Sequence, residues 1–140
     1  MAVEAFSPDW AAAFKAEVNG SEAYRKAAKG WKWTVGLVVE AEPQKNFPEA
    51  RGIVMDLYDG DARDVSVGSA DDARACDFVL TSSYSRWKDV AQKKLDATRG
   101  MLQGKIKLKG DLATIVRYTK AAQQLTEATT RVDVIWPDGG

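Results

Sequence analysis

Apolar and polar side chains alternate along several short segments of the chain, which is the pattern of strands that bury one face. The first such segment covers residues 31–40, where tryptophan, valine and leucine recur at every second position. Gly52–Tyr58 and Asp61–Val67 alternate in the same way, and the dipeptide Asp59-Gly60 between them favours a tight hairpin turn. A fourth strand is expected around Phe78 and Leu80.

The segment Gln103–Asp111, with the sequence QGKIKLKGD, predicts a fifth strand, a turn and the start of a helix. Ile106 and Leu108 share one face of this strand, because successive side chains point to opposite faces. The other face carries the lysines Lys105, Lys107 and Lys109. Gly110 allows the chain to turn, and the side chain of Asp111 can accept hydrogen bonds from the first amides of the helix.

Apolar residues at helical spacing predict helices on either side of these strands. Two helices, Pro8–Val18 and Ser21–Ala28, come before the first strand. After the fourth strand, Ser85 and Asp96 are each expected to cap a helix. A long helix is expected from Leu112 to about Glu127.

The remaining segments are expected to connect or extend these elements. Ala41–Ala50 contains two prolines and is predicted to be a loop, and Gly68–Arg74 is predicted to be an acidic loop. Val132–Trp136 alternates again, so the tail at 129–140 is predicted to be either a further edge strand or a lid strap. The order of elements predicts an α+β fold, in which an about five-stranded, mostly antiparallel sheet is covered by helices.

The segment MLQGKIKLKGDLATIVRY, residues 101–118, resembles the terminal signature of the sterol carrier protein 2 family. CDFVLT, residues 76–81, resembles a strand of the same family, and Trp87 stands where the family places an aromatic or apolar residue. The resemblance covers roughly residues 75–118 and extends, by the order of elements alone, back to about Trp10. The chain departs from the family at Lys93-Lys94, where the family often has Gly-Lys.

This resemblance implies a sterol carrier protein 2-like fold with an apolar tunnel between the sheet and the last helices. It also implies non-catalytic binding and transfer of a fatty acid, a fatty acyl-CoA, a sterol or an isoprenoid lipid. The apolar side chains expected along the tunnel are Phe78, Leu80, Trp87, Met101, Leu102, Ile106, Leu112, Ile115 and Val116. Plain core packing stays open for each of them, since a tunnel wall and a core are both apolar. Gln103 is expected to hydrogen-bond either a strand end or the polar head of the ligand.

Length and composition suit one domain over residues 1–140, with a tail at 129–140 whose structure the sequence leaves open. Hydrophobic residues make up 45% of the chain and charged residues 29%, as in ordinary globular proteins. No apolar run approaches the about 18 residues that a membrane span needs. The first ten residues lack the pattern of a secretory signal and there is a single cysteine, so the cytoplasm is the expected location.

Catalytic chemistry has few candidate residues in this chain. Histidine is absent, which removes the commonest general base and the commonest metal ligand. Cys76 falls within a predicted strand and is expected to be an inert core thiol. No residue spacing indicates a metal site or a nucleotide cradle, so we expect no metal, no cofactor and no enzyme activity. An enzymatic alternative would depend on Asp77, Tyr84 or Asp111.

Charge is unevenly distributed, although 20 basic and 20 acidic side chains balance overall. Residues 86–120 contain ten basic side chains against three acidic ones. A solvated surface explains such an excess, and so does an anionic partner such as a lipid head group or the phosphates of acyl-CoA. The expected docking residues are Lys93, Lys94, Lys105, Lys107 and Lys109. Nucleic acid is not expected, because the aromatic residues do not alternate with the basic ones.

The expected partners are a lipid or fatty acyl-CoA ligand and, transiently, an anionic membrane surface. A different interpretation stays open, in which the domain is an accessory or oligomerisation module that presents substrate to a partner enzyme or holds a homodimer together. A stable homodimer without extractable lipid would favour that interpretation.

Overall fold

A central sheet organises the fold in the computed structural model, which describes residues 2–140. Within those residues the sheet has five strands in the order β4-β3-β2-β5-β6. The strands are β2 (Thr34–Glu40), β3 (Arg51–Tyr58), β4 (Asp61–Gly68), β5 (Phe78–Ser83) and β6 (Lys107–Lys109). β2 and β5 are parallel, and the other neighbouring pairs are antiparallel. The predicted α+β fold with a mostly antiparallel sheet is therefore confirmed.

The alternating pattern correctly marks the buried face of the sheet. Val35 and Leu37 of β2 lie opposite Met55 and Ile53 of β3, and all four side chains are buried in one core cluster. The predicted turn between β3 and β4 also forms. Asp59 has a φ of 48° and Gly60 a φ of 91°, the left-handed values that a two-residue hairpin turn of this kind requires.

The predicted first strand starts too early, because Trp31 and Trp33 precede β2, which begins at Thr34. The indole nitrogen of Trp31 donates a 2.8 Å hydrogen bond to the Trp33 carbonyl. The Trp31 ring also packs edge-on against Tyr118, with ring centroids 5.1 Å apart. These local contacts hold the two tryptophans outside the ladder of the sheet.

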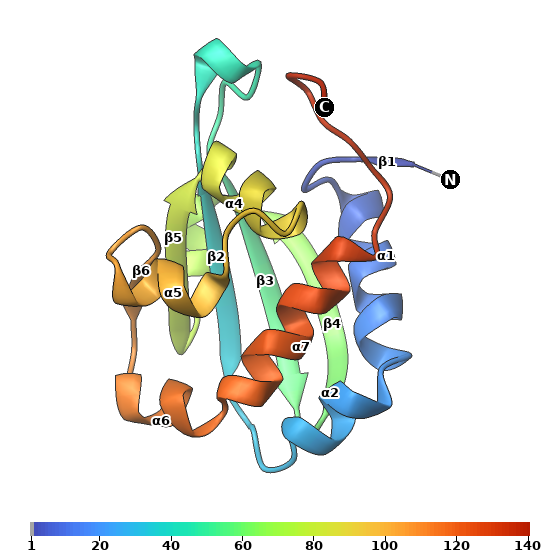
Figure 1. Ribbon diagram of the computed structural model, residues 1–140, viewed down its shortest axis with the longest axis vertical. Helices are drawn as coiled ribbons and strands as arrows, with labels where there is room; N and C mark the ends of the chain where they lie inside the picture. The colour runs from blue at the N-terminus through green and yellow to red at the C-terminus, as the bar shows by residue number, and fades with distance from the viewer. Residues whose placement is uncertain (1) are drawn as a thin grey trace.

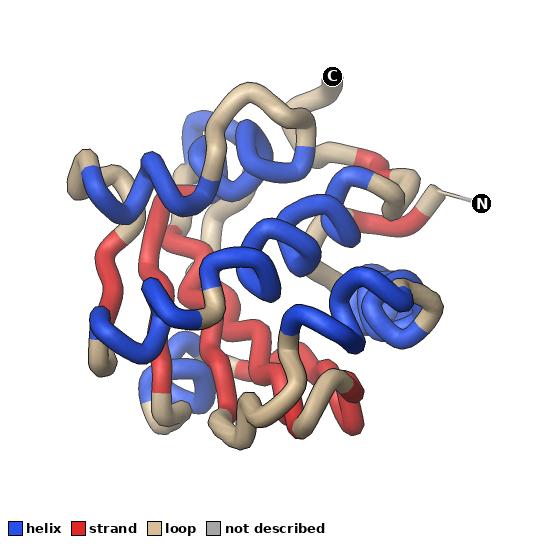
Figure 2. The backbone as a smooth tube through the Cα atoms, turned by 60° about the horizontal axis from the view of Figure 1, so that its bottom comes forward, coloured by secondary structure: helices blue, strands red, loops and turns tan. Residues whose placement is uncertain are grey.

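Helices cover one face of the sheet, as Figures 1 and 2 show. α7 lies across this face and contacts α1, which packs along β4. Helices on this side include α1 (Pro8–Asn19), α2 (Glu22–Ala27), α4 (Tyr84–Ala91), α5 (Ala97–Leu102), α6 (Leu112–Arg117) and α7 (Thr119–Thr130). Large side chains such as Trp10, Phe14 and Tyr84 are buried in the core cluster that includes the covered face of the sheet. Removing this apolar surface from water is the main force that holds the layers together.

α3 (Ala70–Arg74) packs on the opposite face of the sheet, where the sequence predicts an acidic loop. That prediction is wrong because Ser69 and Asp72 form a capping box. The Ser69 hydroxyl accepts a 3.1 Å hydrogen bond from the Asp72 amide, and the Asp72 carboxylate accepts one of 3.0 Å from the Ser69 amide. Gly36 and Gly52 lie beneath α3, and their lack of a Cβ allows the helix backbone to approach the strands closely.

The long helix predicted from Leu112 to about Glu127 is two helices, α6 and α7, separated at Tyr118. Tyr118 has a φ of −107° and a ψ of 31°, outside helical values, and its ring is held against Trp31. Asp111 caps α6 as predicted, since its carboxylate accepts a 3.2 Å hydrogen bond from the Ala113 amide.

The caps of α4 and α5 were predicted with mixed success. Asp96 caps α5 as expected and accepts a 3.1 Å hydrogen bond from the Arg99 amide. α4 is capped by Ser83 instead of Ser85. The Ser85 amide donates a 2.7 Å hydrogen bond to Glu42, which immediately precedes the short 3-10 helix η1 (Pro43–Lys45) in the predicted loop.

The tail pairs with the N-terminal segment and not with the main sheet. β7 (Val134–Ile135) runs parallel to β1 (Val3–Glu4), and Figure 1 shows the tail continuing past β1. The Asp138 carboxylate accepts hydrogen bonds from the Tyr84 hydroxyl at 2.6 Å and from the Lys88 ammonium at 2.9 Å. These bonds lower the pKa of Asp138, whereas burial raises the pKa of Tyr84. The tail therefore does contain a short strand, although it pairs with β1 and not with the main sheet, and the residues after it are held to α4.

Candidate ligand-binding site

Two small apolar cavities lie between the helices and the sheet. The larger has a volume of about 90 Å³ and the smaller a volume of about 60 Å³. The side chains that line both cavities are Val35, Leu80, Met101, Ala122 and Leu125. The cavities are therefore neighbours, with a common wall formed by β2, β5, α5 and α7.

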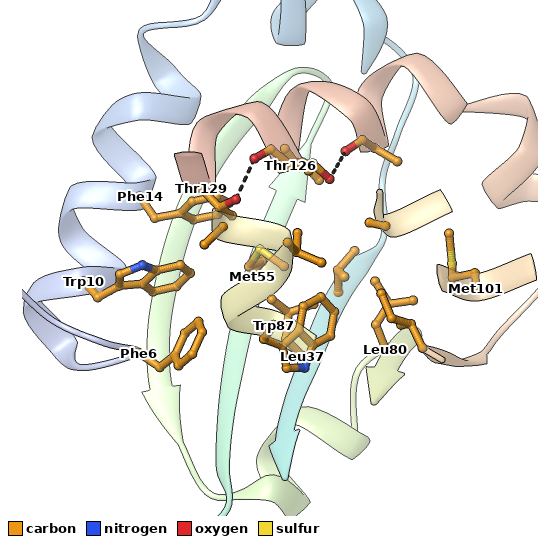
Figure 3. A pocket seen from close by; sticks show the side chains of 17 residues that line it. Phe6, Trp10, Phe14, Leu37, Met55, Leu80, Trp87, Met101, Thr126 and Thr129 are labelled. Carbon is orange, nitrogen blue, oxygen red and sulfur yellow. Dashed lines mark hydrogen bonds between the residues drawn. The ribbon is translucent and has the colours of Figure 1, made fainter. Parts of the chain in front are cut away.

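Strands of the sheet and helices on its covered face both contribute to the larger cavity (Figure 3). Leu37 and Met55 point into it from β2 and β3, because the alternation of the strands directs them to the helical side. Trp10 and Trp87 reach it from α1 and α4. Leu125 closes it from α7. The wall is thus almost wholly apolar and suits a hydrocarbon.

The cavities are smaller than a long lipid requires, since an engineered cavity of about 150 Å³ is known to bind a molecule the size of benzene. Met101 is half-buried and lies in the wall common to both cavities. An unbranched methionine changes its rotamer readily, so this side chain can move without breaking a secondary-structure element. The structure therefore shows two adjoining cavities, and a continuous tunnel requires Met101 and its neighbours to move.

The sequence profile of the SCP-2 sterol transfer family matches residues 12–123, which is most of the chain. The chain belongs to the SCP-2 sterol transfer family. The resemblance found in the signature at residues 101–118 is therefore confirmed. Domains of this family are, in general, lipid-binding carriers.

Solved structures of SCP-2 domains resemble the chain closely. A crystal structure of sterol carrier protein 2 has 33% sequence identity and a TM-score of 0.84, and the match covers 92% of this chain and 99% of that chain. The solution structure of a possible sterol carrier protein from Thermus thermophilus has 31% identity and a TM-score of 0.83, covering 99% of this chain and 97% of that chain. Sterol carrier protein domain 2 of Helicoverpa armigera shares the fold at 20% identity and a TM-score of 0.56, covering 91% of this chain and 90% of that chain. No curated protein matches the chain in sequence.

The structure brings part of the predicted SCP-2 site together around the cavities. Leu80, Trp87, Met101 and Ile106 line the larger cavity. Ile115 lines the smaller cavity, which Leu80 and Met101 also reach. These side chains converge from β5, α4, α5, α6 and the turn before β6. Their contact with a ligand stays a prediction.

Two other predicted residues line neither cavity. Phe78 is buried, but its ring packs against Trp31 with centroids 5.0 Å apart, in an aromatic cluster beside the smaller cavity's wall. Gln103 is exposed and borders a shallow polar hollow that it shares with Lys94 and Arg99. Gln103 therefore does not face the apolar wall. Its expected hydrogen bond to the polar head of the ligand assumed that position beside the wall.

Three predicted apolar residues are exposed to solvent in this SCP-2 domain. Leu102 is 74% exposed, Leu112 52% and Val116 60%. α6 makes its main helix contact with α7, so that only the Ile115 side of its apolar stripe is covered. Leu102, Leu112 and Val116 are thus close in sequence to residues that line a cavity, but their own side chains are not part of the cavity wall.

The walls contributed by α1 and α7 are absent from the residues predicted from sequence. Trp10 and Phe14 lie four positions apart on one face of α1, and Leu125 and Thr129 are related in the same way on α7. This helical spacing was a usable signal. The resemblance to the family was specific only over roughly residues 75–118, so it did not direct attention to either helix.

The five docking lysines are exposed but do not share one side of the sheet. In β6, Lys109 pairs with Val79, which belongs to the small core cluster under α3. Lys107 lies two residues earlier and points to the same side, away from the cavities. Lys105 lies in the turn between α5 and β6. The remaining two, Lys93 and Lys94, lie between α4 and α5.

The residues considered for catalysis serve structural hydrogen bonds and line neither cavity. Asp77 accepts a 3.0 Å hydrogen bond from the Thr34 amide, Tyr84 donates to Asp138, and Asp111 caps α6. Burial raises the pKa of the Cys76 thiol. Within residues 2–140, no group of three or more Cys, Asp or Glu side chains is placed to hold a metal ion. The helices of this same part of the chain are too short or too polar to cross a membrane.

Proposed function

We propose that this SCP-2 domain binds and transfers an apolar lipid without chemical change, with the hydrocarbon chain held between the sheet and the helices. The observation that carries the proposal is the pair of adjoining apolar cavities in this layer. A fatty acid, a fatty acyl-CoA, a sterol or an isoprenoid lipid supplies the apolar surface that such a wall recognises. Each methylene group buried there contributes about 0.8 kcal/mol.

The transfer free energy of the hydrocarbon chain also suits a carrier that releases its lipid, rather than a protein that retains it. A bilayer offers a hydrocarbon chain nearly the same transfer free energy as a protein cavity does. Loading and unloading are then close to balanced, and a modest change in the protein is enough to reverse the direction. Opening and closing of the cavity would supply this change.

We assign the opening to residues 97–117, called the α5–α6 flap, which comprises α5, β6 and α6. Gly104 and Gly110 have positive φ values of 75° and 137° on either side of β6, so glycine supplies backbone freedom at both ends of this strand. Met101 and Ile115 are the flap residues that touch the smaller cavity. Movement of the flap away from α7 would join the two cavities and open them.

The exposed residues of the flap suit contact with an anionic membrane. Leu102 follows the cavity residue Met101, and Leu112 and Val116 flank Ile115. Exposed apolar side chains can insert among acyl chains, and lysines nearby are attracted to anionic lipid. Docking through the flap would place the cavity opening against the acyl chains that it must take up.

Reversing the charge of Lys94, which precedes the flap, and of Lys105, which lies within it, is expected to slow lipid transfer selectively. The Lys94→Glu/Lys105→Glu variant should transfer a fluorescent fatty acid to phosphatidylserine-containing vesicles at least about thirtyfold more slowly at low salt, because each lysine near an anionic surface contributes about 1 kcal/mol. Transfer to vesicles of phosphatidylcholine alone should change little. Stopped-flow fluorescence measures both rates.

The matched control is Lys107→Glu/Lys109→Glu, which makes the same change in charge within β6 of the flap, but on the side of the sheet that faces α3 and away from the cavities. It should slow transfer to anionic vesicles much less than the first variant does. Equal effects of the two variants would show that net charge governs transfer, and they would contradict docking through a particular side of the flap.

A further inference from the structure

The indole nitrogen of Trp10 is a buried hydrogen-bond donor without an acceptor among residues 2–140. Trp10 is 1% exposed and lines the larger cavity. A buried polar group without a partner destabilises the fold by about 1–3 kcal/mol, so native proteins rarely keep one without a use. Trp87 in the same wall shows the usual solution, because its indole nitrogen donates a 3.0 Å hydrogen bond to the Val38 carbonyl.

Two threonines of α7 line the same cavity as Trp10, and their hydroxyl groups are hydrogen-bonded back to carbonyls of their own helix. The Thr126 hydroxyl donates to the Ala122 carbonyl at 3.1 Å, and the Thr129 hydroxyl donates to the Thr126 carbonyl at 2.6 Å. Their protons are thus engaged, while the oxygen lone pairs are left able to accept. Figure 3 shows Trp10, Thr126 and Thr129 around the same cavity, and the Phe14 ring stacks on the Trp10 ring with centroids 5.1 Å apart.

We propose that Trp10, with Thr126 and Thr129, forms a polar subsite that binds a neutral oxygen atom of the carried lipid. The ligand oxygen would accept from the Trp10 indole N–H, and a hydroxyl could also donate to a threonine oxygen. Because this inference rests on the proposed lipid binding, it adds a chemical requirement to that function: an alcohol, ketone or ester group at the end of the ligand that lies against α1.

An ionised carboxylate does not meet the requirement. Among the described residues that line the larger cavity, none is charged. Burying an anion without a cation or several donors is strongly unfavourable, whereas a neutral oxygen needs only the one donor present. A free fatty acid would therefore bind with its carboxylate directed away from Trp10.

The test uses benzyl alcohol and ethylbenzene, which have the same shape and differ by a hydroxyl in place of a methyl group. Both are titrated into the full chain labelled with ¹⁵N-tryptophan, whose five indole N–H signals are assigned by substitution. Benzyl alcohol should move the Trp10 indole signal downfield, and ethylbenzene should not. Trp10→Phe should lower the affinity for benzyl alcohol relative to ethylbenzene about tenfold, because the donor is lost.

Two further variants separate the subsite from general packing. Thr129→Val keeps the side-chain shape and should lower the same affinity ratio about threefold. Trp33→Phe makes the matched change at a half-buried tryptophan that lines neither cavity, and it should leave the ratio unchanged. If Trp10→Phe does not fold, the response of the wild-type Trp10 indole signal and the affinity ratio of Thr129→Val still test the subsite.

An equal response of the Trp10 signal to both compounds, or an unchanged affinity ratio in Thr129→Val and Trp10→Phe, would overturn the subsite while leaving lipid binding intact. Failure of both compounds to bind would overturn it as well, and lipid extraction from the purified protein would then judge the proposed function separately.

Discussion

The Ala122→Phe variant is expected to lose lipid binding while keeping its fold. Ala122 lies on α7 in the wall common to both cavities, so a phenyl ring at this position would fill the space through which the cavities must join. The affinity for a fluorescent fatty acid should fall at least about tenfold, because several methylene groups would lose their place at about 0.8 kcal/mol each. Fluorescence titration measures this loss.

Overpacking is the expected side effect, and it should reduce the free energy of unfolding by about 1–3 kcal/mol. Ala12→Phe is the matched control, since Ala12 is exposed on α1. It should bind the fatty acid as the wild type does. Wild-type affinity in a folded Ala122→Phe variant would show that lipid does not enter between α7 and the sheet.

The second large effect is expected at Gly52, beneath α3. A Cβ at this position would overlap the Ser69 carbonyl oxygen and lie 2.9 Å from the Ala73 Cβ. The overlapped atom is backbone, which cannot turn away as a flexible side chain does. Gly52→Ala should therefore lower the free energy of unfolding by about 3 kcal/mol, near the upper end of the usual range for overpacking. Urea unfolding followed by tryptophan fluorescence measures the change.

Gly20→Ala is the matched control at the end of α1, where φ is −82° and the nearest atom to an added Cβ is 3.3 Å away. Its effect should stay within about 0.5 kcal/mol. A similarly small effect at Gly52 would mean that α3 does not pack on β3 as closely as described.

The strands were predictable because their alternation is strong and the turn at Asp59-Gly60 is unambiguous. α3 was not, since a helix of five residues has too short a pattern, and only the Ser69–Asp72 capping box defines it. The break at Tyr118 was also hidden, because the apolar stripe continues through it. There the packing of the Tyr118 ring on Trp31 overrides local helical preference.

The candidate site was predictable only where motif and periodicity agreed. Met101 and Ile106 fall within the family signature and do line a cavity. Leu102 and Val116 fall within it too, yet they are exposed, because apolar character does not distinguish a wall from a surface that awaits a partner. The role proposed for Trp10 could not be predicted from the sequence, because only the structure shows that its indole nitrogen lacks a hydrogen-bond partner.

Lipid carriage itself is tested most directly by native mass spectrometry of the freshly purified protein, followed by solvent extraction and identification of the released molecules. We expect a bound species with the mass of a fatty acid, a fatty acyl-CoA, a sterol or an isoprenoid lipid, and analysis of the extract should identify it. A protein that shows only its own mass, and still does so after incubation with a mixed-lipid extract, would contradict lipid carriage and favour an accessory or oligomerisation module.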